Sequence, residues 1–188
     1  MSLPALILAA GASSRMGRPK ALVLLDGVTF LAGLVGRLRV AGCAPIVVVA
    51  GAHFVEIQAE LPDGVVLVHA PDWAEGMRAS LRAGLRACPP GDLLLTHVDR
   101  PRVAPATLAA LLAAPPGQAG VPTYAGQDGH PVRLSAQLRP RLLALDDTPL
   151  CDLLIHAARL PVGDPDVLLN INSPADLAAL IPQTARKS

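Results

Sequence analysis

Aromatic residues are nearly absent from this 188-residue chain, which has one tryptophan, one tyrosine and two phenylalanines. Hydrophobic residues nevertheless make up 52% of the sequence, so the core has to be built from alanine, leucine and valine. No uncharged apolar run reaches the roughly 18–20 residues that a membrane-spanning helix requires. A chain of this length is expected to form one domain, which we place at residues 1–182, with residues 183–188 as a flexible tail.

The chain also has few cysteines and a small net charge. Three widely spaced cysteines fit neither a disulfide framework nor a zinc knuckle. The formal net charge of +1 gives no global field that would attract nucleic acid or an acidic membrane, so we expect neither as a partner. The apolar N-terminus lacks the basic leader of a signal peptide, which favours a cytoplasmic location. Any anion-binding function therefore depends on a local site.

Lysine is rare as well: the chain has 14 arginines but only Lys20 and Lys187. Such a bias usually reflects genome composition rather than chemistry. Lys20, however, lies in a glycine-containing stretch, which suggests a site that uses a compact ammonium charge in place of a guanidinium fork. This position makes Lys20 a first candidate for a functional residue.

Continuous apolar runs bounded by turn residues predict strands that are covered on both faces of a sheet. These runs are residues 5–10, 45–50, 64–70, 92–98, 119–124, 131–134 and 166–171. Helical patterns lie between them, with Thr29, Ser135 and Ser173 as expected N-caps. The predicted helices cover residues 29–40, 76–87, 104–114, 136–146, 150–159 and 174–181. This alternation indicates an α/β fold: a doubly wound, mostly parallel sheet in a three-layer α/β/α sandwich, which binds ligands at the carboxyl ends of its strands.

The first predicted strand runs directly into the stretch LILAAGASSRMGRPK, residues 6–20. Its glycines permit close backbone approach, and the N–H groups between them can surround an anion. The serines add hydroxyl donors, and Arg15, Arg18 and Lys20 add positive charge. The spacing fits neither the Walker A loop nor the dinucleotide fingerprint. The residues alone therefore leave two interpretations open: a phosphate-holding loop, or an ordinary strand-to-helix turn with a basic rim.

The pattern L-A-A-G-x-S-x-R-M-G-x-x-K resembles the signature of the MobA-like NTP transferase family, nucleotidyltransferases that activate sugar phosphates and the molybdenum cofactor. Further stretches resemble later motifs of the subgroup that contains molybdenum cofactor cytidylyltransferase, namely residues 71–85, 96–101, 128–132 and 170–177. The resemblance covers nearly the whole chain. It implies a Rossmann-like nucleotide-diphospho-sugar transferase fold and a Mg²⁺-dependent enzyme that transfers a nucleotidyl group from an NTP to a phosphorylated acceptor and releases pyrophosphate.

The resemblance also implies roles for individual residues. Lys20, Arg15 and Asp99 are the expected catalytic residues, with Lys20 as the main stabiliser of the transition state. The expected nucleotide-binding residues are Leu8, Ala9, Ala10, Gly11, Ala12, Ser13, Ser14, Arg15, Gly17, Lys20, Gly76 and Ser80. The expected ligands of Mg²⁺ are Asp99 and Asn172. The residues expected to bind the acceptor are Arg100, His130 and Pro131.

Several positions depart from the family's pattern. Arg100 stands where relatives usually carry Met or Gln, and Ala70 where Asn is common. Asn170 and Asn172 form an N-x-N pair, as in guanylyltransferase-like relatives, where cytidylyltransferase-like relatives often have D-x-D. An amide oxygen ligates Mg²⁺ without adding negative charge, so we expect weaker metal binding than two carboxylates would give.

The resemblance also suggests which nucleotide and which acceptor the enzyme uses. Ala10 sits where guanine-using relatives tend to have glycine, and its methyl group leaves less room for a purine, which favours CTP. The expected acceptor is molybdopterin, as the molybdenum cofactor, with a molybdoenzyme as a further partner. A GTP-using or sugar-1-phosphate nucleotidyltransferase is the alternative enzyme. The alternative of another class is a catalytically weak nucleotide-binding chaperone or regulator of the cofactor, against which the intact Arg15, Lys20 and Asp99 argue.

Overall fold

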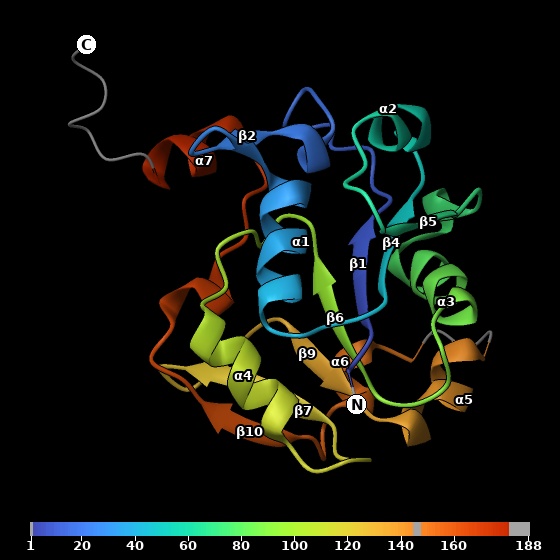
Figure 1. Ribbon diagram of the computed structural model, residues 1–188, viewed down its shortest axis with the longest axis vertical. Coiled ribbons are helices and arrows are strands. Elements are labelled where there is room, and N and C mark those ends of the chain that lie inside the picture. Colours follow the sequence, from blue (N-terminus) through green and yellow to red (C-terminus); the bar gives the residue numbers. More distant parts are fainter. Residues whose placement is uncertain (1, 145–147, 181–188) are drawn as a thin grey trace.

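The computed structural model describes residues 2–144 and 148–180, and its centre is one large sheet (Figure 1). The strand order is β10-β7-β9-β6-β1-β4-β5, and β8 pairs with β7. The strands of this sheet are β1 (Ala5–Ala9), β4 (Ile46–Ala50), β5 (Val66–His69), β6 (Leu93–His97), β7 (Gly120–Tyr124), β8 (Gln127–Asp128), β9 (Val132–Leu134) and β10 (Ala158–Pro161). A small separate sheet pairs β2 (Leu24–Leu25) with β3 (Val28–Thr29).

The sheet is mostly parallel. Parallel pairs join β1 to β4 and β6, β4 to β5, and β7 to β10. The strand β9 runs antiparallel between β6 and β7, and β8 is antiparallel to β7. Because β1, β4 and β6 are parallel neighbours, their carboxyl ends lie at one edge. The predicted α/β fold with a mostly parallel sheet is confirmed.

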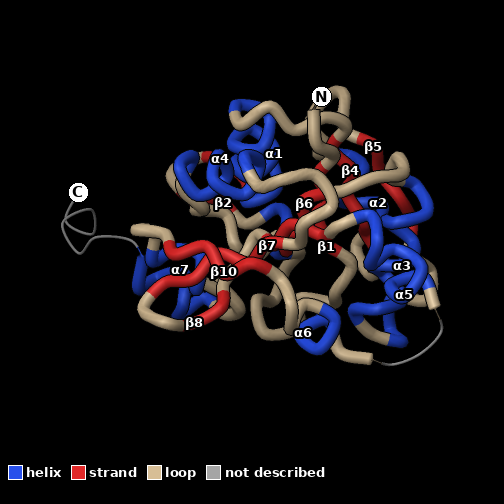
Figure 2. Tube along the Cα trace, turned by 90° about the horizontal axis from the view of Figure 1, so that it is seen from below, coloured by secondary structure: helices blue, strands red, loops and turns tan. Residues whose placement is uncertain are grey.

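Helices cover both faces of the sheet (Figure 2). Along β1, side chains alternate between the faces as strand geometry requires: Ile7 belongs to a core cluster with α1 and α4, and Leu6 and Leu8 to a cluster with α3, α5 and α6. The helices are α1 (Phe30–Val40), α2 (Phe54–Ala59), α3 (Met77–Ala87), α4 (Pro105–Ala113), α5 (Arg139–Leu143), α6 (Leu150–Leu153) and α7 (Pro174–Leu180). Thr29 caps α1 as predicted, because its Oγ1 accepts from Ala32 N at 3.2 Å.

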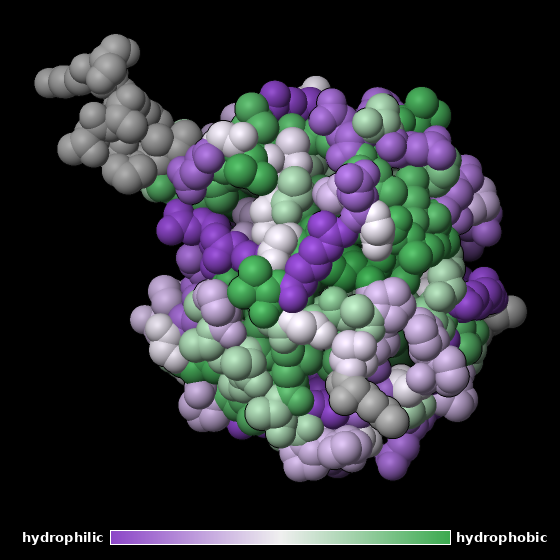
Figure 3. Space-filling model, in the orientation of Figure 1, coloured by the Kyte–Doolittle hydropathy of each residue, from purple (hydrophilic) through white to green (hydrophobic). Residues whose placement is uncertain are grey.

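Apolar side chains also reach the surface. Figure 3 shows them among hydrophilic side chains on the face that carries α1 and α4. The exposed ones include Leu24, Val28 and Val40. This is the result of a composition with 52% hydrophobic residues. Within the described ranges, none of the helices combines the length and the apolarity needed to cross a membrane.

The predicted strand over residues 166–171 is wrong. A 3₁₀ helix, η4 (Pro165–Leu168), occupies the first part of this segment, and the rest is irregular. The cause is Asp164, whose carboxylate accepts from Asp166 N and is also held by Ala104 N and the Thr107 hydroxyl. These contacts impose a helical turn on a sequence that is apolar enough for a strand.

The predicted helix over residues 150–159 is also wrong. The helix α6 ends at Leu153, and β10 follows at Ala158. The Arg159 guanidinium donates to the carbonyls of Leu154, Ile155 and Ala157, which satisfies them without a helical ladder.

The predicted helix over residues 136–146 is split into η3 (Ala136–Leu138) and α5, and the Ser135 side chain makes no capping bond. Residues 145–147 of that prediction, like the predicted tail over 183–188, lie outside the described residues. The sequence interpretation did not predict α2.

Candidate functional site

A pocket of about 460 Å³ lies at the carboxyl ends of β1 and β6. Residues from five separate stretches line it: the glycine loop with the strand end before it, residues 53–57, residues 73–80, residues 97–99 and Asn172. Most of the residues predicted to bind the nucleotide or the metal are in this wall, namely Leu8, Ala9, Ala10, Gly11, Ser13, Ser14, Arg15, Lys20, Gly76, Ser80, Asp99 and Asn172. The structure therefore brings together, from distant parts of the chain, the side chains that the sequence placed at strand ends.

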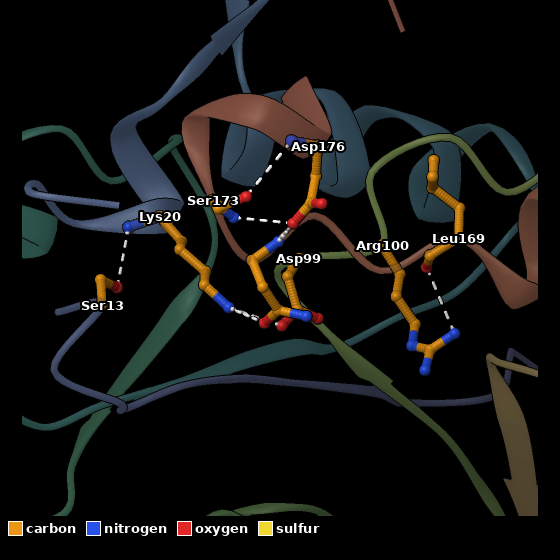
Figure 4. Close-up of polar contacts among 8 residues, drawn as sticks. Ser13, Lys20, Asp99, Arg100, Leu169, Ser173 and Asp176 are labelled. Carbon is orange, nitrogen blue, oxygen red and sulfur yellow. Dashed lines mark hydrogen bonds and ion pairs between the residues drawn. The ribbon is translucent and has the colours of Figure 1, made fainter. Parts of the chain in front are cut away.

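The glycine loop is folded back on itself around Ser13. Ser13 and Gly17 both adopt positive φ, 52° and 72°, which turns the chain twice within five residues. The Ser13 carbonyl accepts from Met16 N at 2.9 Å, and the Ser13 hydroxyl accepts from Lys20 N at 3.0 Å. Ser13 thus closes the loop and fixes where the Lys20 side chain begins (Figure 4).

Three polar side chains meet at the end of the loop. Lys20 Nζ lies 3.0 Å from Asp99 Oδ2 and 2.6 Å from Asn172 Oδ1. The side chains of Lys20 and Asp99 are 15% and 18% exposed, so the ion pair is largely removed from water. Figure 4 shows the Lys20 side chain reaching from the glycine loop towards Asp99.

The oxygens of Asp99 and Asn172 converge on one cation, here the Lys20 ammonium. Carboxylate and amide oxygens are ligands that suit Mg²⁺, which typically takes one or two protein carboxylates and completes its shell with water and substrate phosphates. Within residues 2–144 and 148–180 there is no group of three or more His, Cys, Asp or Glu side chains that could hold a metal ion by themselves. The donor set therefore fits an ion that arrives with a phosphorylated ligand.

Asp176 holds the chain on the far side of Asn172. Its Oδ2 accepts from Asn172 N at 2.9 Å and Ser173 N at 2.8 Å, and its own N–H donates to the Ser173 hydroxyl at 3.3 Å (Figure 4). This is a capping box at the start of α7, which confirms Ser173 as the N-cap. The N–H of Asn172, followed by the bond with Ser173, lowers the pKa of the Asp176 carboxyl.

Ala10 and Trp73 also line the pocket. The Trp73 side chain packs against Gly51 so tightly that a Cβ at residue 51 would lie 2.5 Å from Trp73 Cβ and 2.7 Å from the Ala10 carbonyl oxygen. That carbonyl accepts from Ala52 N at 3.1 Å. Trp73 received no role from the sequence, although a single tryptophan in a stretch already assigned to the nucleotide was a usable signal.

His53 was also missed as a site residue. One of its ring nitrogens, Nε2, lies 2.9 Å from the Ala12 carbonyl oxygen, and the other, Nδ1, lies 3.2 Å from Glu56 Oε1. The ring therefore joins the glycine loop to α2, and it lines the pocket. The sequence carried no signal for this role, because nothing predicted α2.

The residues expected to bind the acceptor lie elsewhere. Arg100, His130 and Pro131 are outside the pocket wall, as are Ala12 and Gly17 of the loop. The Arg100 guanidinium donates to two backbone carbonyls and is turned away from Lys20 (Figure 4). This contact gives Nη1 of Arg100 a role in holding the backbone, and the role of Arg100 in binding the acceptor stays a prediction.

His130 packs behind the pocket instead of lining it. Its ring meets the His97 ring edge-on, with 4.9 Å between the centroids, and His97 is the one of the pair that lines the pocket. Burial lowers the pKa of His97, and burial together with the charges of His97 and Arg100 lowers the pKa of His130 to about 3. Both rings are therefore neutral near pH 7.

The sequence from residue 5 to residue 160 matches the family model described as the MobA-like NTP transferase domain. This chain belongs to the MobA-like NTP transferase family. It is 25% identical over 183 residues to the molybdenum cofactor cytidylyltransferase of Escherichia coli (strain K12), a match that covers 93% of each protein.

Solved structures of related proteins agree with this assignment. Rv0371c from Mycobacterium tuberculosis H37Rv superposes with a TM-score of 0.83 at 30% identity, covering 96% of this chain and 98% of that one. Its complex with manganese gives a TM-score of 0.81 at 28% identity, covering 97% and 100%. A nucleotidyl transferase from Methanothermobacter thermautotrophicus gives a TM-score of 0.80 at 27% identity, covering 100% and 99%. The MobA-like transferase described here is accordingly a nucleotidyltransferase, an enzyme with an NTP as substrate.

Proposed function

We propose that this MobA-like transferase moves CMP from CTP to the phosphate of molybdopterin in the molybdenum cofactor and releases pyrophosphate, with Mg²⁺ as the metal ion. The observation that carries the proposal is that the cationic glycine loop and the Lys20–Asp99–Asn172 cluster line one and the same pocket. Ala10 and Trp73 line that pocket as well. A relative named for this reaction, similar over nearly the whole length of both chains, supports the choice of acceptor.

The reaction requires alignment and charge neutralisation more than covalent chemistry. An oxygen of the acceptor phosphate attacks the α-phosphorus of CTP, the bond from that phosphorus to the bridging oxygen breaks, and pyrophosphate leaves with the bridging oxygen. The N–H groups of the glycine loop and the Arg15 side chain would bind the triphosphate, and Lys20 would stabilise the charge that develops in the transition state. Mg²⁺ held by Asp99 and Asn172 would neutralise negative charge on the α-phosphate.

The preference for CTP depends on Ala10. This residue lines the pocket, and its carbonyl is already bonded to Ala52 N. A methyl group at residue 10 takes up space that a purine would need. The Ala10→Gly variant is therefore expected to gain activity with GTP relative to CTP, by about tenfold for one methyl group in a contact of this kind.

On the acceptor side, the phosphate of the acceptor has to approach beside Asp99. The neighbouring pocket wall is formed by His97 and Val98. We therefore assign the acceptor side to His97 rather than to Arg100, with His130 as the ring that supports His97 from behind. A molybdenum cofactor acceptor implies a cytoplasmic location and a molybdoenzyme that receives the product.

Pyrophosphate release tests the proposal directly. Purified enzyme with Mg²⁺ is given CTP, GTP, UTP or ATP in turn, with the molybdenum cofactor or a sugar 1-phosphate as the acceptor. We expect release with CTP and the cofactor, and loss of release in Asp99→Asn. Release with GTP, or with a sugar 1-phosphate alone, would assign the alternative enzyme. Tight nucleotide binding without release from any pair would favour a nucleotide-binding chaperone or regulator.

A further inference from the structure

The segment that carries Asn172 lies opposite Asp99 without being part of the sheet. It was predicted to continue as a strand over residues 166–171, and ladder hydrogen bonds would then have fixed its position. In the structure, η4 is followed by irregular chain up to α7. A loop of this kind needs other contacts if Asn172 Oδ1 is to stay on the same cation as Asp99 Oδ2.

One backbone hydrogen bond joins this segment to the metal-site aspartate. Ile171 N donates to the Asp99 carbonyl oxygen at 3.0 Å, one residue before Asn172. Ile171 is completely buried, so this bond is shielded from water. A shift of the segment by the width of one side chain would break the bond and move Asn172 away from Asp99.

Arg100, the residue after Asp99, binds the same segment through hydrogen bonds from its side chain. Its Nη1 donates to the Val167 carbonyl at 3.0 Å and to the Leu169 carbonyl at 3.2 Å. Hydrogen bonds from a charged donor are stronger than neutral ones, and those of a partly buried guanidinium are poorly replaced by water. Arg100 thus satisfies the Val167 and Leu169 carbonyls, which a neighbouring strand would satisfy if this segment were part of the sheet.

The other side of the segment is packed with little free space. The Val167 carbonyl also accepts from His130 N at 2.9 Å. A Cβ added at Gly129 would lie 2.7 Å from Val167 Cβ, so the backbone of the 129–130 turn touches this side chain directly. The segment therefore has one well-defined position, between this turn and Arg100.

We propose that Arg100 is a positioning residue: it holds residues 167–171 against Asp99 and so keeps the Asn172 and Asp99 oxygens on one cation. The part of this inference that concerns the metal ion rests on the proposed function. The part that concerns the backbone does not, because the chain makes these contacts with its own atoms alone.

The experiment compares Arg100→Met with Arg139→Met. Arg139 is a matched control, because its guanidinium, like that of Arg100, donates to backbone carbonyls. These are the carbonyls of Leu85, Cys88 and Pro89 at the end of α3. The first measurement is NMR hydrogen exchange of the Ile171 amide without metal or nucleotide, relative to the Ile7 amide of β1. The second is Mn²⁺ affinity by EPR in the presence of a non-hydrolysable CTP analogue.

We expect Arg100→Met to speed exchange at Ile171 about tenfold relative to Ile7, and to weaken Mn²⁺ binding about tenfold, as removal of an outer partner of a metal ligand does. Arg139→Met should leave both quantities unchanged. Arg100→Lys, which retains a single donor group at the site, should give intermediate values, and it carries the test if the methionine variant does not fold.

Unchanged exchange at Ile171 in the Arg100 variants would overturn the inference. Equal changes in the Arg100 and Arg139 variants would also overturn it, because they would show an effect on global stability alone. If the wild-type chain binds no Mn²⁺ with the analogue, the proposed metal site fails, and faster Ile171 exchange would still support the backbone role of Arg100.

Discussion

Lys20 Nζ lies 3.0 Å from Asp99 Oδ2, and the same ammonium lies 2.6 Å from Asn172 Oδ1. The residue expected to bind the triphosphate thus occupies the oxygens expected to bind the metal ion. If Asp99 and Asn172 bind the metal ion as proposed, the ammonium has to leave these oxygens for the phosphates when a nucleotide and its metal enter. Binding of the metal and movement of Lys20 are then linked, because each competes for the same two ligands.

Replacement of Lys20 by methionine tests this competition. Turnover is expected to fall by about 10²- to 10³-fold, because a charge that stabilises the transition state is lost. Mn²⁺ affinity in the absence of nucleotide is expected to rise instead, since no ammonium pairs with Asp99. Arg18→Met is the control: it removes a charge from the same loop, but Arg18 is exposed and outside the pocket wall. Unchanged nucleotide-free Mn²⁺ affinity in Lys20→Met would contradict the competition.

Asn172→Asp should make the enzyme need less metal. A second carboxylate adds negative charge where the amide has none. This charge attracts a divalent metal ion more strongly than it attracts the singly charged Lys20 ammonium. The Mg²⁺ concentration for half-maximal pyrophosphate release is expected to fall several-fold. Asn170→Asp serves as the matched control, because Asn170 is exposed and does not line the pocket. Identical Mg²⁺ curves for wild type and Asn172→Asp would rule out Asn172 as a metal ligand.

Gly51→Ala should disturb the end of the pocket next to Trp73. The added Cβ would lie 2.5 Å from Trp73 Cβ and Cγ and 2.7 Å from the Ala10 carbonyl oxygen, so the ring or the backbone has to move. We expect the free energy of unfolding in urea to fall by about 1–3 kcal/mol. CTP affinity, followed through the fluorescence of the single tryptophan, should fall as well. In Gly36→Ala, where a Cβ meets nothing within 4 Å, both quantities should stay the same or improve.

His130 makes stability depend on pH. Burial lowers its pKa from 6.5 to about 3. Below pH 6.5 the unfolded chain therefore binds a proton that the folded chain does not, and the free energy of unfolding falls as the pH falls towards 3. The loss between pH 7 and pH 5 is expected to be about 2 kcal/mol smaller in His130→Gln than in wild type. The same substitution at the exposed His156 is the matched control.

The central strands and the core of the site could be predicted because their signals are local. Solid apolar runs identify β1, β4 and β6, and in a parallel sheet their carboxyl ends have to meet. The same two facts predict that the glycine loop and Asp99 share one edge of the sheet, and the pocket lies there. Thr29 as the cap of α1 was predictable for the same reason: the capping bond spans three residues.

The errors arose where distant contacts decide the conformation. Residues 166–171 are as apolar as a strand, but the Asp164 carboxylate, fixed by Ala104 and Thr107 some sixty residues away in sequence, sets a helical turn there. Trp73 is a pocket residue only because Gly51, on a different strand end, leaves room for its ring. Neither the periodicity of the sequence nor residue propensities predict contacts between residues so far apart in the chain.

By itself, the sequence determined the fold class, the glycine loop after the first strand and, through the family motif, membership of the nucleotidyltransferases, because these depend on hydrophobic pattern and on motifs of contiguous residues. The tertiary structure alone decided how they are used. It placed the Lys20 ammonium on the Asp99 and Asn172 oxygens, engaged Arg100 with the backbone carbonyls of Val167 and Leu169, and buried His130 behind His97. Each of these outcomes depends on which side chains the packing brings within hydrogen-bond or van der Waals distance.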